Sequence, residues 1–165
     1  MSSEPLLDFD VVKEPWNKYE LSDRAVLKTK LVLTKIMKEH LGNLANAYAI
    51  DFQNFAVILT DERGQLGTRI YSREELQASI VEDNIKCDPI SEEWNEYAVN
   101  DGGQIRIQSK VIRVAKTSLF DLNGKPIYWV ESNQIPEIKP LQVGIMKNPS
   151  DAVRVSVRKL DLAIQ

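Results

Sequence analysis

Hydrophobic and polar residues alternate with a period of two over much of this chain, which is typical of half-buried β-strands. The alternation is clear over 141–145 and 153–157, on either side of a turn-like stretch at 147–151. It resumes one residue out of phase over 160–164, which predicts a bulge near Arg158. The C-terminal region is therefore expected to form a β-hairpin.

Two segments that lie 78 residues apart resemble each other. Residues 16–23 are WNKYELSD and residues 94–101 are WNEYAVND, so Trp, Asn, Tyr and Asp recur at one offset. Given the two tryptophans, chance agreement at the Asn, Tyr and Asp positions has a probability on the order of 10⁻⁴. We interpret 14–60 and 92–135 as two copies of one module, each with three strands.

The similarity continues along both copies. Residues 34–38 match 112–116 and, after a gap of about five residues, the apolar run 55–60 matches 127–132. In the second copy, Asn123-Gly124 lies between apolar runs, which is a strong hairpin signal because both turn positions favour a positive φ. The second copy is therefore expected to be β.

Residues 28–48 of the first copy allow two interpretations. Apolar residues recur there at helical spacing among good helix formers. Gly42 interrupts that pattern, and the aligned part of the second copy carries the hairpin signal. We favour strand over helix for 26–38, and we leave room for a short helical insert within 39–53.

The region between the copies predicts a hairpin followed by a helix. Residues 55–60 and 66–71 are typical of strands on either side of a turn. Ser72 followed by Glu75 is a capping-box pattern, which predicts a helix over 73–83.

The sequence therefore predicts a β-rich α+β protein. Two tandem, related antiparallel β modules would form a sandwich or a barrel-like unit, with one short helix between them. The expected division is an N-terminal arm at 1–13, a first module with hairpin and helix at 14–82, a connector at 83–91, and a second module with the C-terminal hairpin at 92–165.

Composition adds limits on location and partners. The 165 residues are 43% apolar and 27% charged, and the formal net charge is -3, which argues against a dedicated binder of duplex nucleic acid. The first residues lack the pattern of a signal peptide, and no apolar run approaches the roughly 20 residues that a membrane span needs. One unpaired cysteine fits a reducing compartment, so we expect a cytoplasmic protein with no membrane partner.

Few residues offer catalytic or metal-binding chemistry. Cys87 and His40 are the single cysteine and histidine, and they do not fit a nucleophile or zinc pattern, so we expect no catalytic site, no metal and no cofactor. Asp23 and Asp101 recur at equivalent places and are expected to cap turns. A small carboxylate-dependent enzyme is a remote alternative, which requires these residues or Asp121 to converge on a pocket.

Aromatic and basic residues are the candidates for a binding surface: Trp16, Tyr19, Trp94, Tyr97, Tyr128, Trp129, Arg106 and Arg113. Repeated Trp and Tyr most simply fill the small core of each module. Aromatics beside basic residues also suit single-stranded nucleic acid. Because neighbours in a strand alternate, one of the adjacent Tyr128 and Trp129 is expected to point away from the core.

These observations favour a non-catalytic binding or assembly protein. A protein partner or a second copy would engage a sheet edge or an aromatic patch. The alternative is a single-stranded nucleic-acid binder of OB-like type.

One family resemblance follows from the repeated motif. The Trp-Asn-x-Tyr-x-Leu/Val-x-Asp stretch and the later Asp121-x-Asn-Gly-x-Pro-x-Tyr-x-Val resemble a group of short uncharacterised, mainly archaeal single-module β proteins, over about half of this chain. The first copy departs from that pattern, because Arg24-Ala25 replaces the glycine after Asp23. The resemblance implies an archaeal, cytoplasmic setting and no activity.

Overall fold

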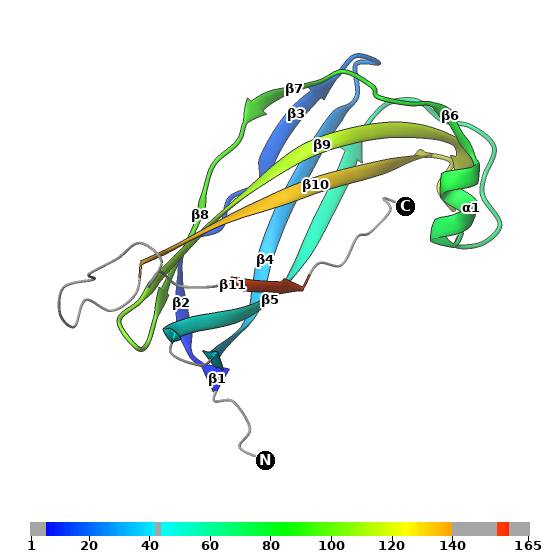
Figure 1. The fold of residues 1–165 in the computed structure, drawn as a ribbon. Helices are drawn as coiled ribbons and strands as arrows, with labels where there is room; N and C mark the ends of the chain where they lie inside the picture. The colour runs from blue at the N-terminus through cyan, green and yellow to red at the C-terminus, as the bar shows by residue number, and fades with distance from the viewer. Residues whose placement is uncertain (1–5, 42–43, 140–154, 159–165) are drawn as a thin grey trace.

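The computed structural model describes residues 6–41, 44–139 and 155–158 (Figure 1). Within these ranges the chain forms eleven strands and one short helix. The strands build two sheets, and all but one of the strand pairs are antiparallel. The predicted β-rich class with a single short helix is confirmed.

The first sheet has the strand order β11-β5-β4-β3-β7, and β1 pairs with β4. Its strands are β1 (Leu6–Leu7), β3 (Asn17–Leu21), β4 (Val26–Leu41), β5 (Leu44–Leu59), β7 (Cys87–Ser91) and β11 (Val155–Arg158). The second sheet has the order β10-β9-β8-β2, and β6 pairs with β9. Its strands are β2 (Phe9–Lys13), β6 (Ile80–Glu82), β8 (Asn95–Val99), β9 (Gln104–Phe120) and β10 (Pro126–Lys139).

Two edge strands, β2 and β7, each pair with a strand from the other half of the chain. β2 precedes the first Trp motif but pairs with β8 in the second sheet, whereas β7 precedes the second Trp motif but pairs with β3 in the first. The expected arm at 1–13 therefore contains β1 and β2, and the expected connector at 83–91 contains β7. Pro89 fits β7 because this strand lies at a sheet edge, where a missing N–H costs least.

β4 and β5 form a long β-hairpin, drawn in Figure 1 as the light-blue strand and the turquoise strand. Strand for 26–38 is confirmed, and the helical insert within 39–53 is wrong. Tyr48, Ile50 and Phe52 alternate into the core, and burial of this face decides against the helical propensity. Tyr48 opposes Lys38 as Tyr128 opposes Lys116, so the alignment of 55–60 with 127–132 was out of register.

The segment over 66–83 is only partly as expected. The capping box is confirmed, because the Ser72 hydroxyl accepts from the Glu75 N–H, and it starts α1 (Arg73–Ala78). The helix is shorter than the predicted 73–83, since β6 follows it and pairs with β9. The predicted strand at 66–71 does not form.

That segment packs against the β9–β10 turn instead. The Gly64 N–H donates to the Gly124 carbonyl at 2.8 Å, and the Gly67 N–H donates to the Asp121 carbonyl at 2.8 Å. The expected hairpin turn forms, but only Gly124 has a positive φ, of 80°, and Asn123 does not. The loop therefore closes over one end of the second hairpin.

Gly67 is expected to tolerate no side chain. A β-carbon there would overlap the Phe120 carbonyl oxygen, which is backbone and cannot rotate away. Gly67→Ala should therefore cost roughly 1–3 kcal/mol in the free energy of unfolding, measured by urea titration. Gly64→Ala is the matched comparison, because its β-carbon meets the Phe120 ring, which is a movable side chain. An equal or larger loss for Gly64→Ala would contradict this account.

The two sheets pack face to face around two hydrophobic clusters. One joins residues such as Leu33, Ile36 and Phe52 of the first sheet with Ile105 and Ile107 of the second. The other joins Tyr19, Leu21 and Leu27 with Val114 and Tyr128. Each cluster thus draws on both halves of the chain, so neither half has a core of its own.

The C-terminal prediction is tested only in part. Residues 141–154 and Lys159 lie outside the described residues, so the first strand of the expected hairpin and the expected bulge are not described. Val155–Arg158 forms β11, which pairs in parallel with β5, from Val155 opposite Tyr48 to Arg158 opposite Asp51.

Candidate functional site

Three of the candidate binding tyrosines are buried between the sheets. The Tyr19 hydroxyl donates to the Glu92 carboxylate at 2.6 Å, and the Tyr97 hydroxyl donates to the Glu14 carboxylate at 2.7 Å. The Tyr128 hydroxyl donates to Asp23. These hydrogen bonds join the two halves of the chain, and the three tyrosines are only 0–2% exposed.

A fourth buried tyrosine, Tyr48, was missed by the sequence analysis. Its hydroxyl donates to Asp101, which is the counterpart of the contact between Tyr128 and Asp23. Burial, with the neighbouring carboxylate as the second cause, raises the pKa of each of the four tyrosines above its ordinary value. The offset of 78 residues that relates the two Trp motifs also relates Glu14 to Glu92. This repeat is the sequence signal that could have identified the two glutamates as partners of the repeated tyrosines.

The repeated aspartates cap turns, as expected. Asp23 accepts from the Ala25 N–H at 3.0 Å, and Asp101 accepts from the Gly103 N–H at 2.9 Å. Asp121 accepts from two N–H groups of its own turn. The three carboxylates are thus engaged in different turns and do not converge on one pocket. Among the described residues, no group of three or more His, Cys, Asp and Glu side chains could hold a metal ion.

Cys87 has the properties of a structural thiol. It packs against the second hydrophobic cluster, and burial, followed by the charges of Asp88 and Glu92, raises the pKa of its thiol to about 11. The thiolate that nucleophilic chemistry needs is therefore scarce at neutral pH.

Trp129 is also buried, although it lies on the opposite face of β10 from Tyr128. It packs with Leu76 of α1, Ala115 and Ile127, and its indole N–H donates to Glu131 at 3.0 Å. As expected, one of the adjacent pair points away from the core between the sheets, and this is Trp129; its ring is nevertheless buried, because α1 covers that outer face.

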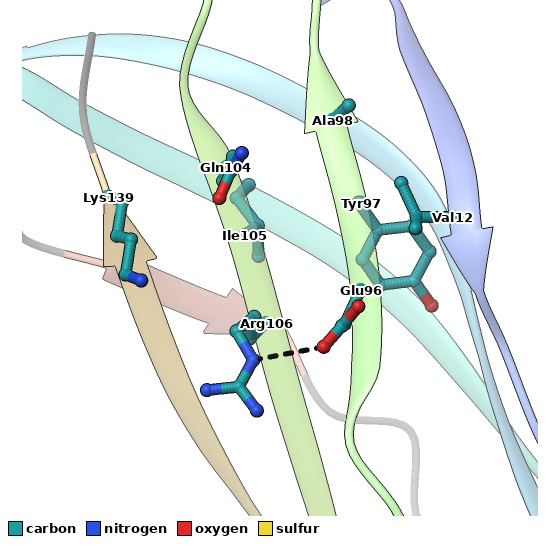
Figure 2. Close-up of a pocket in the computed structure, with 8 residues that line it drawn as sticks. All are labelled: Val12, Glu96, Tyr97, Ala98, Gln104, Ile105, Arg106 and Lys139. Carbon is teal, nitrogen blue, oxygen red and sulfur yellow. Dashed lines mark ion pairs between the residues drawn. The ribbon is translucent and has the colours of Figure 1, made fainter. Parts of the chain in front are cut away.

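The outer face of the second sheet has a hollow with a volume of about 290 Å³ that is lined in part by charged side chains (Figure 2). Its lining residues are Val12, Glu96, Tyr97, Ala98, Gln104, Ile105, Arg106 and Lys139. Arg106 pairs with Glu96 at 3.4 Å and with Glu137 at 3.3 Å, and its guanidinium lies 4.5 Å from the centre of the Trp94 ring. Arg113, further along β9, pairs with Asp83 and Glu131. These arginines are neutralised within the chain.

The outer face of the first sheet differs at the equivalent positions. Lys28 occupies the place of Arg106, but its cross-strand neighbours are Lys18 and Val57 where Arg106 has Glu96 and Glu137. The ammonium groups of Lys28 and Lys30 lie 4.9 Å and 5.7 Å from the centre of the Trp16 ring. Within the described part of the chain, none of these three lysines forms an ion pair. We call Lys18, Lys28 and Lys30 the lysine cluster.

Beside the lysine cluster, β5 carries an exposed apolar row. The row is Phe55, Val57 and Leu59, which are 43%, 39% and 49% exposed, and Trp16 is 38% exposed. Cross-strand pairing places Phe55 opposite Lys30 and Val57 opposite Lys28. The apolar row and the lysine cluster therefore lie side by side on the outer face of the first sheet.

The edge of β5 beyond this row is open in the described part of the chain. β11 pairs with β5 only from Tyr48 to Asp51, whereas β4 pairs along the other side up to Leu59. Backbone groups on an open edge can pair with another strand. Of the sequence-predicted site residues, the structure leaves Trp16 on this face and Trp94 on the other.

Comparisons with protein-family models, with curated proteins and with solved structures give no match. No helix among the described residues is long and apolar enough to cross a membrane. The candidate site is thus defined by geometry alone, as the apolar row, the lysine cluster, Trp16 and the edge of β5 that no described strand pairs with.

Proposed function

We propose that this chain is a non-catalytic binding or assembly protein that docks a segment of a partner protein on the outer face of its first sheet. The observation that carries the proposal is the contrast between Lys28 and Arg106. The same place in the two sheets has a neutralised arginine on one face and an uncompensated lysine beside apolar side chains on the other.

The first face is unfavourable in the isolated protein. Directly opposed like charges such as Lys18 and Lys28 destabilise a sheet, and the apolar row leaves hydrocarbon in water. The second sheet supports the same strand pairing with Glu96 and Glu137 beside Arg106, and it has one exposed apolar residue, Ile135, where the first sheet has the row. Folding alone therefore does not require the opposed lysines or the full row. A bound partner would relieve both costs.

We also propose that the chain is a tandem duplication whose copies have exchanged their first strands. In support, contacts recur at an offset of 78 residues. The Ser22 N–H donates to the Lys86 carbonyl as the Asn100 N–H donates to the Asp8 carbonyl, and the Asn17 amide reaches the Ser109 carbonyl as the Asn95 amide reaches that of Leu31. Exchange of the first strands would explain why each hydrophobic cluster contains residues of both copies.

We also keep a cytoplasmic location as part of the proposal, on the basis of the single unpaired cysteine.

Single-stranded nucleic acid is the second candidate ligand, and Trp16 favours it. An exposed ring beside two lysines could stack a base and pair with phosphates. The proposal for a protein partner is stronger because Trp94, the other expected stacking ring, is already covered by Arg106, and because the apolar row has no role in binding phosphates.

Selection from a random peptide display library against the whole chain tests the proposed function. We expect enriched peptides whose binding falls at least tenfold in Phe55→Thr and Leu59→Thr. Threonine keeps the β propensity at these exposed positions, so the fold should persist.

Ile135→Thr is the matched control, because Ile135 is exposed at the place in β10 that Phe55 occupies in β5. Binding should survive this change. Two results would contradict a protein-docking face. One is a set of peptides that bind all three variants as tightly as the parent chain. The other is tight binding of oligo(dT) when the library yields no enriched peptide.

A further inference from the structure

We infer that the docked segment is acidic, with carboxylates that bind the lysine cluster beside Trp16 while its apolar side chains cover the apolar row. This inference rests on the proposed function and adds the chemistry of the partner. It starts from charge complementarity, since three cations gather on a face of a chain whose net charge is -3.

The three lysines point to the same side of the sheet. Tyr19 and Leu27 are buried in the core, so their neighbours Lys18 and Lys28 project outward, as does Lys30 two residues further along β4. The one carboxylate on the adjacent part of β3, Glu20, pairs across to Val26 and not to a lysine. The cluster therefore keeps its positive charge within the described surface.

The spacing of the lysines and of the apolar row determines which spacing of acidic and apolar residues a partner segment needs. Lys28 and Lys30 are two residues apart on a strand, which separates them by about 7 Å, and the apolar row runs about 5 Å to one side. Carboxylates about 6–7 Å apart occur at every second residue of a strand or every fourth residue of a helix. An acidic amphipathic segment thus matches both parts of the face at once.

A polynucleotide would match only half of this surface. Its phosphates could meet the lysines, but it offers no aliphatic surface for Val57 and Leu59, which would remain exposed. An acidic protein segment covers the row and neutralises the lysines, with Trp16 beside Lys28 and Lys30. For this reason we assign the face to a protein and not to nucleic acid.

Paired synthetic peptides test the inference on the whole chain. One set carries leucines on one side and glutamates on the flank, and the matched set has glutamine in place of each glutamate. We expect the glutamate peptides to bind about fivefold to tenfold more tightly at low salt, with the difference shrinking as salt is added. The same difference should shrink in Lys28→Gln/Lys30→Gln, whereas Lys110→Gln, an exposed lysine elsewhere on β9, should leave it unchanged.

A second variant gives the first sheet the charge arrangement that surrounds Arg106 in the second sheet. Lys18→Glu/Val57→Glu gives Lys28 the two glutamate neighbours that Arg106 has, and the second sheet folds with that arrangement. Binding of the glutamate peptides should fall at least tenfold while circular dichroism and melting stay close to those of the parent chain.

Three outcomes would overturn the inference. Glutamine peptides that bind as tightly as glutamate peptides, with Phe55→Thr still weakening both, would reject an acidic partner and keep the proposed function. Oligo(dT) that displaces the peptides and binds more tightly would assign the face to nucleic acid. Concentration-dependent dimerisation that Phe55→Thr abolishes and the peptides cannot displace would assign it to a second copy of this chain.

Discussion

Replacing Tyr97 with alanine is expected to lower the free energy of unfolding by about 3–5 kcal/mol, the largest loss among the single substitutions considered. The ring is fully buried, meets Phe9 edge to face at 5.8 Å, and packs in the first hydrophobic cluster. Removing it leaves a cavity between the sheets and also frees the Glu14 carboxylate, which comes from the other half of the chain. Urea unfolding followed by circular dichroism measures the loss.

Tyr97→Phe separates the hydrogen bond from the packing. This variant keeps the ring but leaves the carboxylate of Glu14 without the hydroxyl donor, so the expected loss is about 1–3 kcal/mol. Tyr19→Phe is the matched variant, because Tyr19 makes the counterpart contact with Glu92, and its loss should be of similar size. A Tyr97→Phe variant as stable as the parent chain would show that these contacts do not hold the halves together.

Alkaline unfolding is the second large effect that the structure predicts. Burial and neighbouring carboxylates raise the pKa of Tyr19, Tyr48, Tyr97 and Tyr128 above the ordinary value of about 10. The folded chain therefore keeps protons that the unfolded chain loses. The stabilisation is complete below the unfolded pKa and is lost as pH rises toward the folded pKa.

The expected slope is steep because four groups act together. Each tyrosine that is ionised only in the unfolded chain removes roughly 1.4 kcal/mol of stability per pH unit. We expect cooperative unfolding above about pH 10, with phenolate absorbance of these tyrosines appearing together with the loss of circular dichroism. The Cys87 thiol, whose pKa is raised to about 11, acts in the same direction.

Tyr128→Phe provides the control for this titration. It removes one of the four groups, so the dependence of stability on alkaline pH should become shallower by about one proton. A gradual phenolate titration of all tyrosines in a chain that keeps its circular dichroism would contradict the account.

Some elements followed directly from local sequence. The Asn123-Gly124 turn and the Ser72 capping box depend on a few neighbouring residues, and both form, with a positive φ at Gly124 and not at Asn123. The edge strands β2 and β7 did not follow, because five residues with a proline or charged neighbours carry little periodicity. Their pairing comes from the opposite half of the chain, which local pattern does not specify.

The binding candidates show the same division. Sequence favoured a core role for the repeated tyrosines, and Tyr19, Tyr97 and Tyr128 are buried. It could not tell that Trp16 stays exposed or that α1 covers Trp129. Trp16 and Trp94 occupy equal places in the repeated motif and differ in what surrounds them. The apolar row of β5 was not a candidate, because an apolar run in a strand is usually core.

The alternation of apolar residues, the turn signals and the repeated Trp motif determined by themselves that this chain is β-rich and that Asp23 and Asp101 occupy matching turns. Only the tertiary structure decided which strands pair between the halves, which aromatic rings are buried, and which face keeps unpaired lysines beside apolar side chains. The physical reason is that alternation fixes two faces for each strand, while burial of a face depends on what packs against it from distant parts of the chain.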